Sequence, residues 1–255
     1  RNLAEEVRKI HKYQVAFRKL IEEYKNAGLL PVYDAGFISL DKQFLTIGIN
    51  GMVEAAEYLD IAPTNNEQYK EFVRHHLKII YDENRKAREI YGYMFNTEFV
   101  PAENLGVKNA LWDKKSGLFS PRECYNSYFY AVEDDHINVL DKIILHGKEF
   151  IEYLDGGSAL HLNLEETPNK EGFLKLLNAT ALAGCNYFCF NIRITICNEC
   201  NHIDKRTLFE CPECHSENVD HATRVIGYLK RVSCFSTARQ KEHKLRHYHL
   251  STSKR

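Results

Sequence analysis

Four cysteines near the end of the chain carry the clearest chemical signal. Cys197 and Cys200 form one C-x-x-C pair, and Cys211 and Cys214 form a second pair after ten intervening residues. Zinc prefers four soft ligands at tetrahedral angles, and each C-x-x-C turn supplies two thiolates. Because four sulfur ligands leave no open coordination position, the spacing predicts a structural zinc site in a small ribbon.

Other interpretations of these cysteines are weaker. Two disulfides would suit a secreted protein, but the sequence shows no charged-then-apolar leader, which favours a reducing cytoplasm. A redox-active pair is disfavoured because there are two matched pairs. His202 and His215 are substitute ligands that four well-spaced cysteines make unnecessary.

The charge balance argues against nucleic-acid binding, which many zinc ribbons perform. The chain has 34 Lys and Arg residues against 35 Asp and Glu residues, a net charge of -1. No stripe of basic and aromatic residues accompanies the cysteines, so we expect no direct contact with nucleic acid. The most apolar stretch, residues 176–192, is interrupted by Asn and Gly, and we expect no membrane span either.

A glycine shortly after the cysteines is the second candidate. Gly227 stands in an R-V-x-G-Y pattern that begins at Arg224. A glycine between apolar residues is usually a turn or a bulge. A radical on Cα, however, is stabilised between the amide nitrogen and the carbonyl only if the residue can flatten, and glycine does so with least steric conflict. The position after a predicted zinc ribbon makes this second interpretation worth weighing.

The elements that must position these residues alternate along the chain. Apolar periodicity predicts helices at 2–26, 52–60, 65–90, 135–153 and 169–183, and strands at 36–40, 91–95, 159–164 and 185–194. This alternation predicts parallel βα units in a large α/β body. Beyond Cys197 we expect the cysteine pairs, a strand-like stretch at 223–232 and a charged, frayed tail. We therefore divide the chain into residues 1–195 and residues 196–255.

Several longer segments, together with the glycine motif, resemble one family from end to end. R-V-x-G-Y is similar to the radical loop of glycyl radical enzymes, and the surrounding sequence resembles the anaerobic (class III) ribonucleoside-triphosphate reductases. The segments that carry the resemblance are Pro31–Ile38, Leu40–Phe44, Asn96–Glu103, Tyr125–Tyr128, Tyr153–His161, Cys197–Cys200, Asp204–Leu208 and Thr223–Val232.

The resemblance implies a fold and a reaction. Family members fold as a ten-stranded α/β barrel, of which this chain would be the C-terminal portion, followed by a small zinc ribbon and the glycyl radical loop. A radical-SAM activating enzyme would remove a hydrogen atom from Gly227. The stored radical would then generate a thiyl radical that reduces ribonucleoside triphosphates to deoxyribonucleoside triphosphates, with electrons from formate or a thioredoxin-type donor. The family further implies a cytoplasmic enzyme, homodimeric at full length, that supplies DNA precursors.

The resemblance also limits what this chain does alone. The chain begins at Arg1 within a helical pattern, which we interpret as a beginning that has been removed. In the family the thiyl cysteine precedes the matching segment, so none of the four cysteines outside the zinc motif is assigned to that role. The allosteric nucleotide site and any ATP-cone would lie upstream as well. We therefore expect this chain alone to be inactive.

Other residues are candidates for a substrate cavity. Asn96, Glu98 and Glu103 follow a predicted strand, where barrel enzymes carry active-site residues. A loop glutamate is as often a solvated cap as a ligand for a ribose hydroxyl. Cys124, in a loop beside aromatic residues, either faces the cavity or packs as a small buried side chain. Cys185 and Cys189 are expected to share one face of a strand and to pack.

Three other functions remain to be weighed. The chain could belong to another glycyl radical enzyme, of the formate-lyase or dehydratase type, although the resemblance associates the ribbon before the glycine with the reductases. It could instead be a non-enzymatic zinc-ribbon binding module in which Gly227 is a plain turn. A spare part that repairs oxygen-damaged enzyme is disfavoured because the chain extends far beyond the radical loop.

Overall fold

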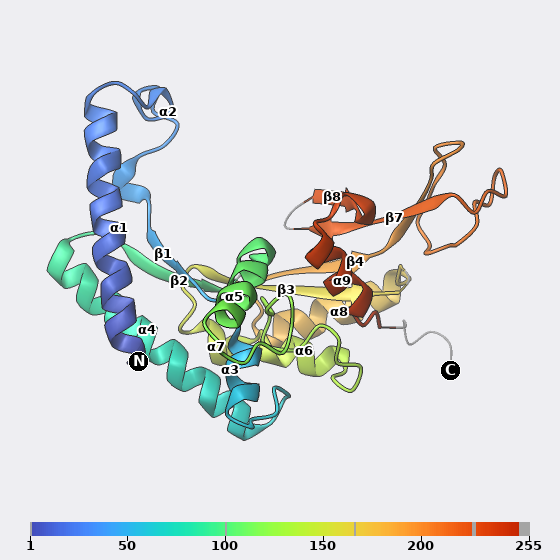
Figure 1. Cartoon of the computed structure of the whole chain (residues 1–255), viewed down its shortest axis with the longest axis horizontal. Coiled ribbons are helices and arrows are strands. Elements are labelled where there is room, and N and C mark those ends of the chain that lie inside the picture. The colour runs from blue at the N-terminus through green and yellow to red at the C-terminus, as the bar shows by residue number, and fades with distance from the viewer. Residues whose placement is uncertain (1, 100, 166, 226–227, 250–255) are drawn as a thin grey trace.

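The computed structural model describes residues 2–99, 101–165, 167–225 and 228–249 (Figure 1). It contains two sheets of different character. Strands β1 to β4 form a parallel sheet with helices packed against it, and strands β5 to β8 form a small antiparallel sheet. The α/β class predicted from the alternation of elements is confirmed.

The parallel sheet follows the order β1-β2-β3-β4. Its strands are β1 (Leu45–Gly48), β2 (Phe95–Phe99), β3 (Gly157–Leu164) and β4 (Tyr187–Ile192). The pairing of β2 with β3 covers only two residues of each strand, whereas β3 and β4 pair over six residues. The sheet therefore opens between β2 and β3 at the carboxyl end of β3.

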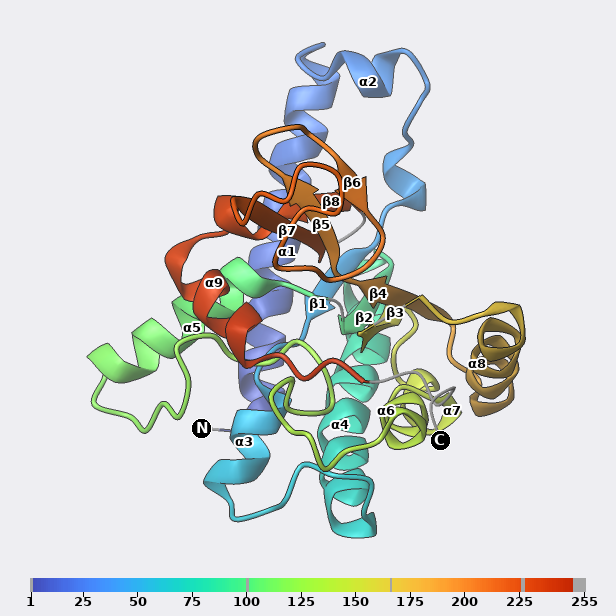
Figure 2. The same ribbon diagram turned by 90° about the vertical axis from the view of Figure 1, so that its right-hand side faces the viewer.

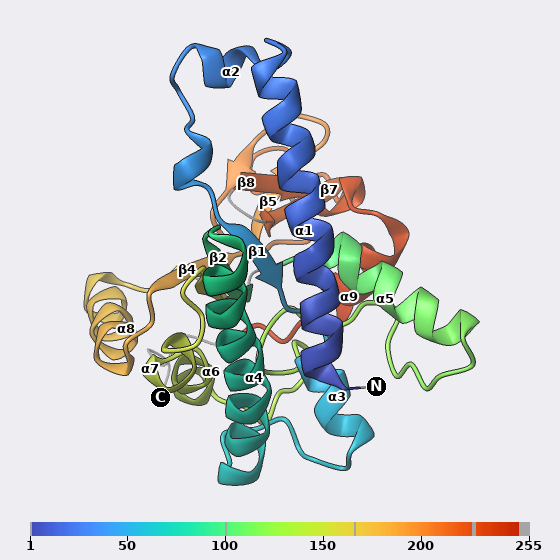
Figure 3. The same cartoon turned by 90° about the vertical axis from the view of Figure 1, so that its left-hand side faces the viewer.

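Long helices cover one side of this sheet (Figure 3). Helix α1 (Leu3–Asn26) and helix α4 (Glu67–Tyr91) pack behind β1 and β2, while α6 (Val139–Leu145) and α8 (Lys170–Ala183) lie behind β3 and β4. Each of these four helices begins at an asparagine whose side chain accepts a hydrogen bond from a backbone N–H of the first turn. Helices α4 and α8 end at glycines with positive φ, which L residues rarely adopt.

Shorter helices connect these elements. They are α2 (Pro31–Asp34), the 3-10 turn η1 (Leu40–Lys42), α3 (Met52–Tyr58), α5 (Glu103–Lys115) and α7 (Lys148–Ile151). Helix α3 follows the carboxyl end of β1, and α5 follows that of β2. Both ends lie at the edge of the sheet where ligands of parallel α/β folds bind.

The second sheet starts almost where the first one ends. Its strands are β5 (Ile194–Cys197), β6 (Ile203–Asp204), β7 (Val219–Val225) and β8 (Tyr228–Arg231), in the order β6-β5-β7-β8. One residue, Arg193, separates β4 from β5, close to the expected boundary at 195/196. In Figure 1, β7 and β8 lie above the parallel sheet and helices α6 and α8 lie below it.

Up to residue 249 the chain is folded, so the expectation of a frayed tail was wrong for this part; residues 250–255 lie outside the described residues. After the 3-10 turn η2 (Val232–Cys234), helix α9 (Thr237–Leu245) carries Glu242, which pairs with Arg239 and Arg246. The backbone N–H of His249 then donates to the carbonyl of Asn163 on β3 at 3.0 Å. The many charged residues of this segment suggested that it would not fold. In the structure its charged groups pair with one another, which allows them to be buried.

Three other elements differ from expectation. The predicted strand at 36–40 is a turn followed by η1, and Phe37 is 84% exposed, so its apolar residues do not form a buried strand. Strand β2 starts at Phe95, four residues later than predicted, because α4 continues to Tyr91 and ends at Gly92. The predicted helix at 135–153 is divided into α6 and α7 at Gly147. Among the described residues, no helix is long and apolar enough to cross a membrane.

Gly147 provides a test of the packing between α6, α7 and α8. A Cβ at this position would lie 2.6 Å from the carbonyl oxygen of Ala183 and 3.0 Å from that of Ile144. Gly147→Ala should therefore lower the free energy of unfolding of the zinc-loaded protein by about 1–3 kcal/mol, measured by urea denaturation. Gly48→Ala is the matched control, because a Cβ there meets nothing within 4 Å. Equal stability of the two variants would contradict this packing.

Candidate functional site

The side of the parallel sheet that faces away from α4 and α8 is polar. On β2, Phe95 and Phe99 belong to the apolar clusters behind the sheet, so Asn96 and Glu98, which alternate with them, face the other way. The same alternation applies to β3 and β4. We call this side the inner face; its polar side chains are Asn96, Glu98, His161, Asn163, Cys189 and Asn191.

Hydrogen bonds and register hold the inner face together across β3 and β4. His161 pairs in register with Cys189, and Asn163 pairs with Asn191. The Asn191 amide donates to Asn163 Oδ1 at 3.3 Å, and the Cys189 thiol donates to Asn191 Oδ1 at 3.2 Å. Four neighbouring side chains on two strands therefore form one buried polar cluster.

Arg224 brings the second sheet against this cluster. Its Nη2 donates to the hydroxyl of Tyr187, the first residue of β4, at 3.3 Å. Arg224 is three residues before Gly227, which lies outside the described residues. The residues on either side of positions 226 and 227 are held in register, because Val225 on β7 pairs with Tyr228 on β8. Figure 2 shows the strands of this second sheet in front of β1 to β4.

The surroundings of His161 keep its imidazole neutral. Burial, together with the guanidinium groups of Arg224 and Arg246, lowers the pKa of His161 to about 4. The hydroxyl of Tyr128 lies 3.3 Å from His161 Nδ1. Within the described part of the chain, three buried polar atoms of this region have no hydrogen-bond partner. They are Asn96 Oδ1, His161 Nε2 and Arg224 Nε.

The other predicted cavity residues lie elsewhere. Cys124 is buried, 7% exposed, and its sulfur lies 3.2 Å from the place that a Cβ of Gly106 on α5 would take. It also lines two cavities against α9, one of about 350 Å³ and one much smaller. Glu103 is the first residue of α5, and its side chain lies outside the described part of the structure. The structure therefore brings Asn96 and Glu98 together on one face and places Cys124 between α5 and α9.

The four predicted zinc ligands converge. Their Sγ atoms all lie within 4.8 Å of one another, with Cys197 and Cys214 3.6 Å apart and Cys200 and Cys211 3.5 Å apart. A zinc ion bound by four thiolates at about 2.3 Å needs sulfur atoms about 3.8 Å apart, so the cluster fits zinc.

The backbone of each C-x-x-C turn is shaped for metal binding. The residue after each pair, Asn201 in one and His215 in the other, has a positive φ of 60° and 57°. The N–H groups of Cys200 and Glu199 donate to Cys197 Sγ and lower the pKa of that thiol to about 6. These two N–H groups therefore favour the thiolate form of Cys197, whereas the neighbouring thiols raise the pKa of Cys200 and Cys214.

The comparison with protein families decides the identity. The family profile described as anaerobic ribonucleoside-triphosphate reductase matches residues 1–249. The chain belongs to this family.

Solved structures support the assignment to the anaerobic ribonucleoside-triphosphate reductases. One anaerobic ribonucleotide reductase is 32% identical, with a TM-score of 0.87, and the match covers 98% of this chain and 41% of that one. The anaerobic ribonucleotide reductase from Thermotoga maritima, in complex with dATP and CTP, is also 32% identical, with a TM-score of 0.82 and coverage of 94% and 40%. The chain therefore spans about two fifths of the length of these structures. No curated protein sequence matches it.

Arg224 and Cys189 contribute to the site, although the sequence analysis did not select them as site residues. Sequence reasoning treated Arg224 only as part of a motif and expected Cys185 and Cys189 to share a face. In the structure Cys185 precedes β4, and its thiol donates to the carbonyl of Ile143 behind the sheet. Cys189 is on the inner face, so the expectation of a shared face was wrong. In the sequence, Cys189 alternates with the apolar residues Phe188 and Phe190. This pattern predicts that Cys189 faces away from the apolar side of the sheet.

Removal of one cysteine tests the predicted zinc site. Cys211 is 1% exposed, so Cys211→Ser replaces a buried thiolate by a poorer ligand. Bound zinc, measured by atomic absorption after dialysis, should fall from about one ion per chain to well below one. Amide hydrogen exchange in residues 194–225 should become faster. Cys234→Ser, at an exposed cysteine outside the cluster, is the control; zinc retained by Cys211→Ser would argue against the site.

Proposed function

We propose that this chain holds the radical store and part of the substrate-binding wall of an anaerobic ribonucleoside-triphosphate reductase. In this proposal zinc is bound by Cys197, Cys200, Cys211 and Cys214, and the glycyl radical resides on Gly227. The observation that carries the proposal is the contact of Arg224 with Tyr187. It ties the strand that leads to Gly227 to the polar inner face of the sheet.

The proposed reaction stores one unpaired electron in the chain. A radical-SAM activating enzyme removes a hydrogen atom from Gly227 Cα, and the stored radical later takes a hydrogen atom from a thiol. The substrate is a ribonucleoside triphosphate, whose 2′ hydroxyl leaves as water. Formate, oxidised to carbon dioxide, or a thioredoxin-type dithiol supplies the two electrons. The family supports this sequence of steps, and this chain supplies the glycine and its surroundings.

The side chains of the inner face suit the binding of a polar substrate. His161 does not serve as a general acid in this proposal. Asn96 and Glu98 are placed to accept hydrogen bonds from ribose hydroxyl groups, because both lie near the carboxyl end of β2. Neutral His161 offers either a donor or an acceptor at Nε2, but no charge at pH 7. In the proposed complex these groups orient the ribose beneath the radical loop. Zinc, bound by four thiolates, has only a structural role.

The radical assignment is tested by electron paramagnetic resonance. The zinc-loaded protein, incubated without oxygen with the activating enzyme, S-adenosylmethionine and a reductant, should give a glycyl-type doublet. Gly227→Ala should abolish the doublet, and air should cleave the parent chain at residue 227. Gly48→Ala is the matched glycine control and should keep the signal. A doublet that persists in Gly227→Ala would exclude this glycine, and a folded, zinc-loaded parent without a signal would favour a plain binding module.

The substrate assignment is tested separately at Glu98. In a preparation that turns over, Glu98→Gln should lower kcat by about 10²-fold or more, because the amide replaces a charged acceptor at the ribose. The glycyl doublet should keep its intensity, since Glu98 does not contribute to the radical loop. Glu171→Gln, at an exposed position on α8, is the charge-matched control. Unchanged turnover in Glu98→Gln would remove this residue from the substrate site.

A further inference from the structure

A cavity of about 600 Å³ lies on another part of the molecule, between α3, α5 and the loop at 118–125. This volume is in the range of specific ligand pockets. The cavity is lined mainly by aromatic and aliphatic side chains. Its polar lining includes the carboxylates of Glu54 and Asp113, but neither Lys nor Arg lines it among the described residues. It shares no lining residue with the inner face, so it is a separate site.

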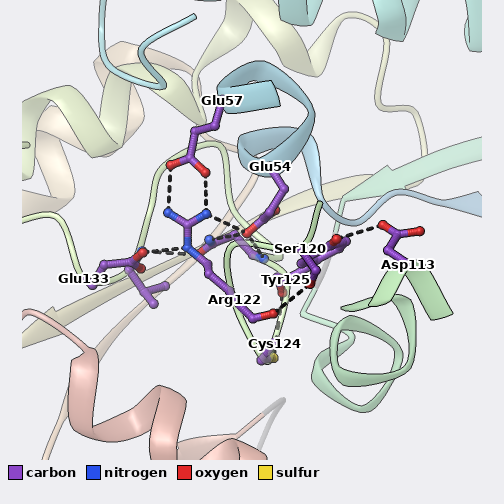
Figure 4. A network of polar contacts seen from close by, with 10 residues as sticks. Glu54, Glu57, Asp113, Ser120, Arg122, Cys124, Tyr125 and Glu133 are labelled. Carbon is purple, nitrogen blue, oxygen red and sulfur yellow. Dashed lines mark hydrogen bonds and ion pairs between the residues drawn. The ribbon is translucent and has the colours of Figure 1, made fainter. Parts of the chain in front are cut away.

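An ion network with an excess of carboxylates adjoins this cavity through Glu54, which lines it (Figure 4). Arg122 donates to Glu57 through Nη1 and Nη2, to Glu133 through Nε at 2.6 Å, and to Glu54 Oε1 at 3.3 Å. Three carboxylates therefore share one guanidinium. Asp113, at the wall, accepts a hydrogen bond from the hydroxyl of Tyr125 at 2.7 Å.

Glu54 is the member of this network that has one carboxylate oxygen without a hydrogen-bond partner among the described residues. It is 5% exposed, and its Oε1 accepts from the backbone and side-chain amides of Asn126. Its Oε2 has no hydrogen-bond partner within the described residues. A Cβ on Gly51 would lie 3.8 Å from this oxygen and 3.2 Å from Tyr125 Cδ2, so the oxygen lies at the wall that Gly51 and Tyr125 form. Burial raises the pKa of Glu54, although the hydrogen bonds from Asn126 and the guanidinium of Arg122 act in the opposite direction.

Large apolar side chains surround the opening on both sides. They are Tyr58 and Leu59 from α3, Trp112 from α5, and Leu118 and Phe119 from the following loop, each more than half exposed. An exposed apolar rim of this extent is typical of a protein contact and is wider than a small ligand covers. A central pocket that takes one arginine within an apolar rim is a common arrangement at protein interfaces.

We propose that this cavity binds a segment of a protein partner that inserts an arginine side chain next to an apolar residue. The guanidinium meets the carboxylates of Glu54 and Asp113, and its flat face packs on the aromatic walls. The apolar neighbour covers Leu118 and Phe119. This inference does not depend on the radical chemistry, and it can be tested on the zinc-loaded protein without activation.

The chain contains its own reporter. Trp112 is the single tryptophan, and it lines the cavity. Acetyl-leucyl-arginine amide should change the Trp112 emission in a saturable titration. Acetyl-leucyl-citrulline amide, in which a neutral urea replaces the guanidinium, should bind at least about tenfold more weakly.

Two variants examine separate parts of the proposal. Glu54→Gln keeps an acceptor oxygen for Asn126 and removes the charge, so it should weaken the arginine peptide by about tenfold and leave the citrulline peptide unchanged. Ala55→Phe, at an exposed position on α3 that lines the cavity, should block both peptides without altering the carboxylates. Glu171→Gln, which makes the same charge change on α8, should bind like the parent.

Three results would overturn the proposal. Equal affinity for the two peptides would remove the role of the guanidinium. Unchanged binding in Ala55→Phe would place the peptide elsewhere. Dimers that form with rising protein concentration in sedimentation, and that Ala55→Phe disrupts, would assign the cavity to a second copy of this chain.

Discussion

The opening of the parallel sheet between β2 and β3 is the constraint on which the arrangement of the C-terminal part depends. The two strands pair only at Glu98 with Gly157 and at Phe99 with Ser158, and β3 then continues without β2 beside it. Backbone N–H and C=O groups that are buried there need partners. The end of the chain supplies them, because His249 donates to the carbonyl of Asn163 and accepts from the N–H of Glu165 at 2.9 Å.

The aromatic loop at 125–132 fills the same opening from the other direction. The hydroxyl of Tyr130 donates to the carbonyl of His161 at 2.9 Å, and the carbonyl of Val132 accepts from the N–H of His247 at 2.8 Å. His146, which packs among these rings, is fully buried and has a pKa lowered to about 3 by that burial. Because a neutral imidazole carries no charge, it can be buried away from water in this region without an ionic partner. The loop and the tail together fix α9, and through it the small sheet, above the inner face.

The sequence was most informative where local chemistry alone decides the structure. Four cysteines at zinc spacing needed no tertiary information, and they converge as predicted. Apolar periodicity predicted the bounds of the long helices α1, α4 and α8 to within two residues. The start of β2, the break at Gly147 and the ordered tail depended on contacts with distant segments. Asn96 and Glu98 were predicted because strand ends carry function in α/β folds, and the structure places both on the inner face, whereas the position of Cys189 required knowledge of which face of β4 is covered.

In the proposed function, the position of the four-cysteine cluster gives a structural metal a role beside the radical loop. Strand β5 begins one residue after β4 and ends at Cys197, and it pairs with β7 from Ile194 opposite Ala222 to Cys197 opposite Val219. Strand β7 continues directly to Arg224, which contacts Tyr187. A metal that fixes Cys197 therefore also fixes the strand that leads to Gly227. Four thiolates suit this role, because a closed zinc site is redox-inert and offers no open coordination position to compete for the radical.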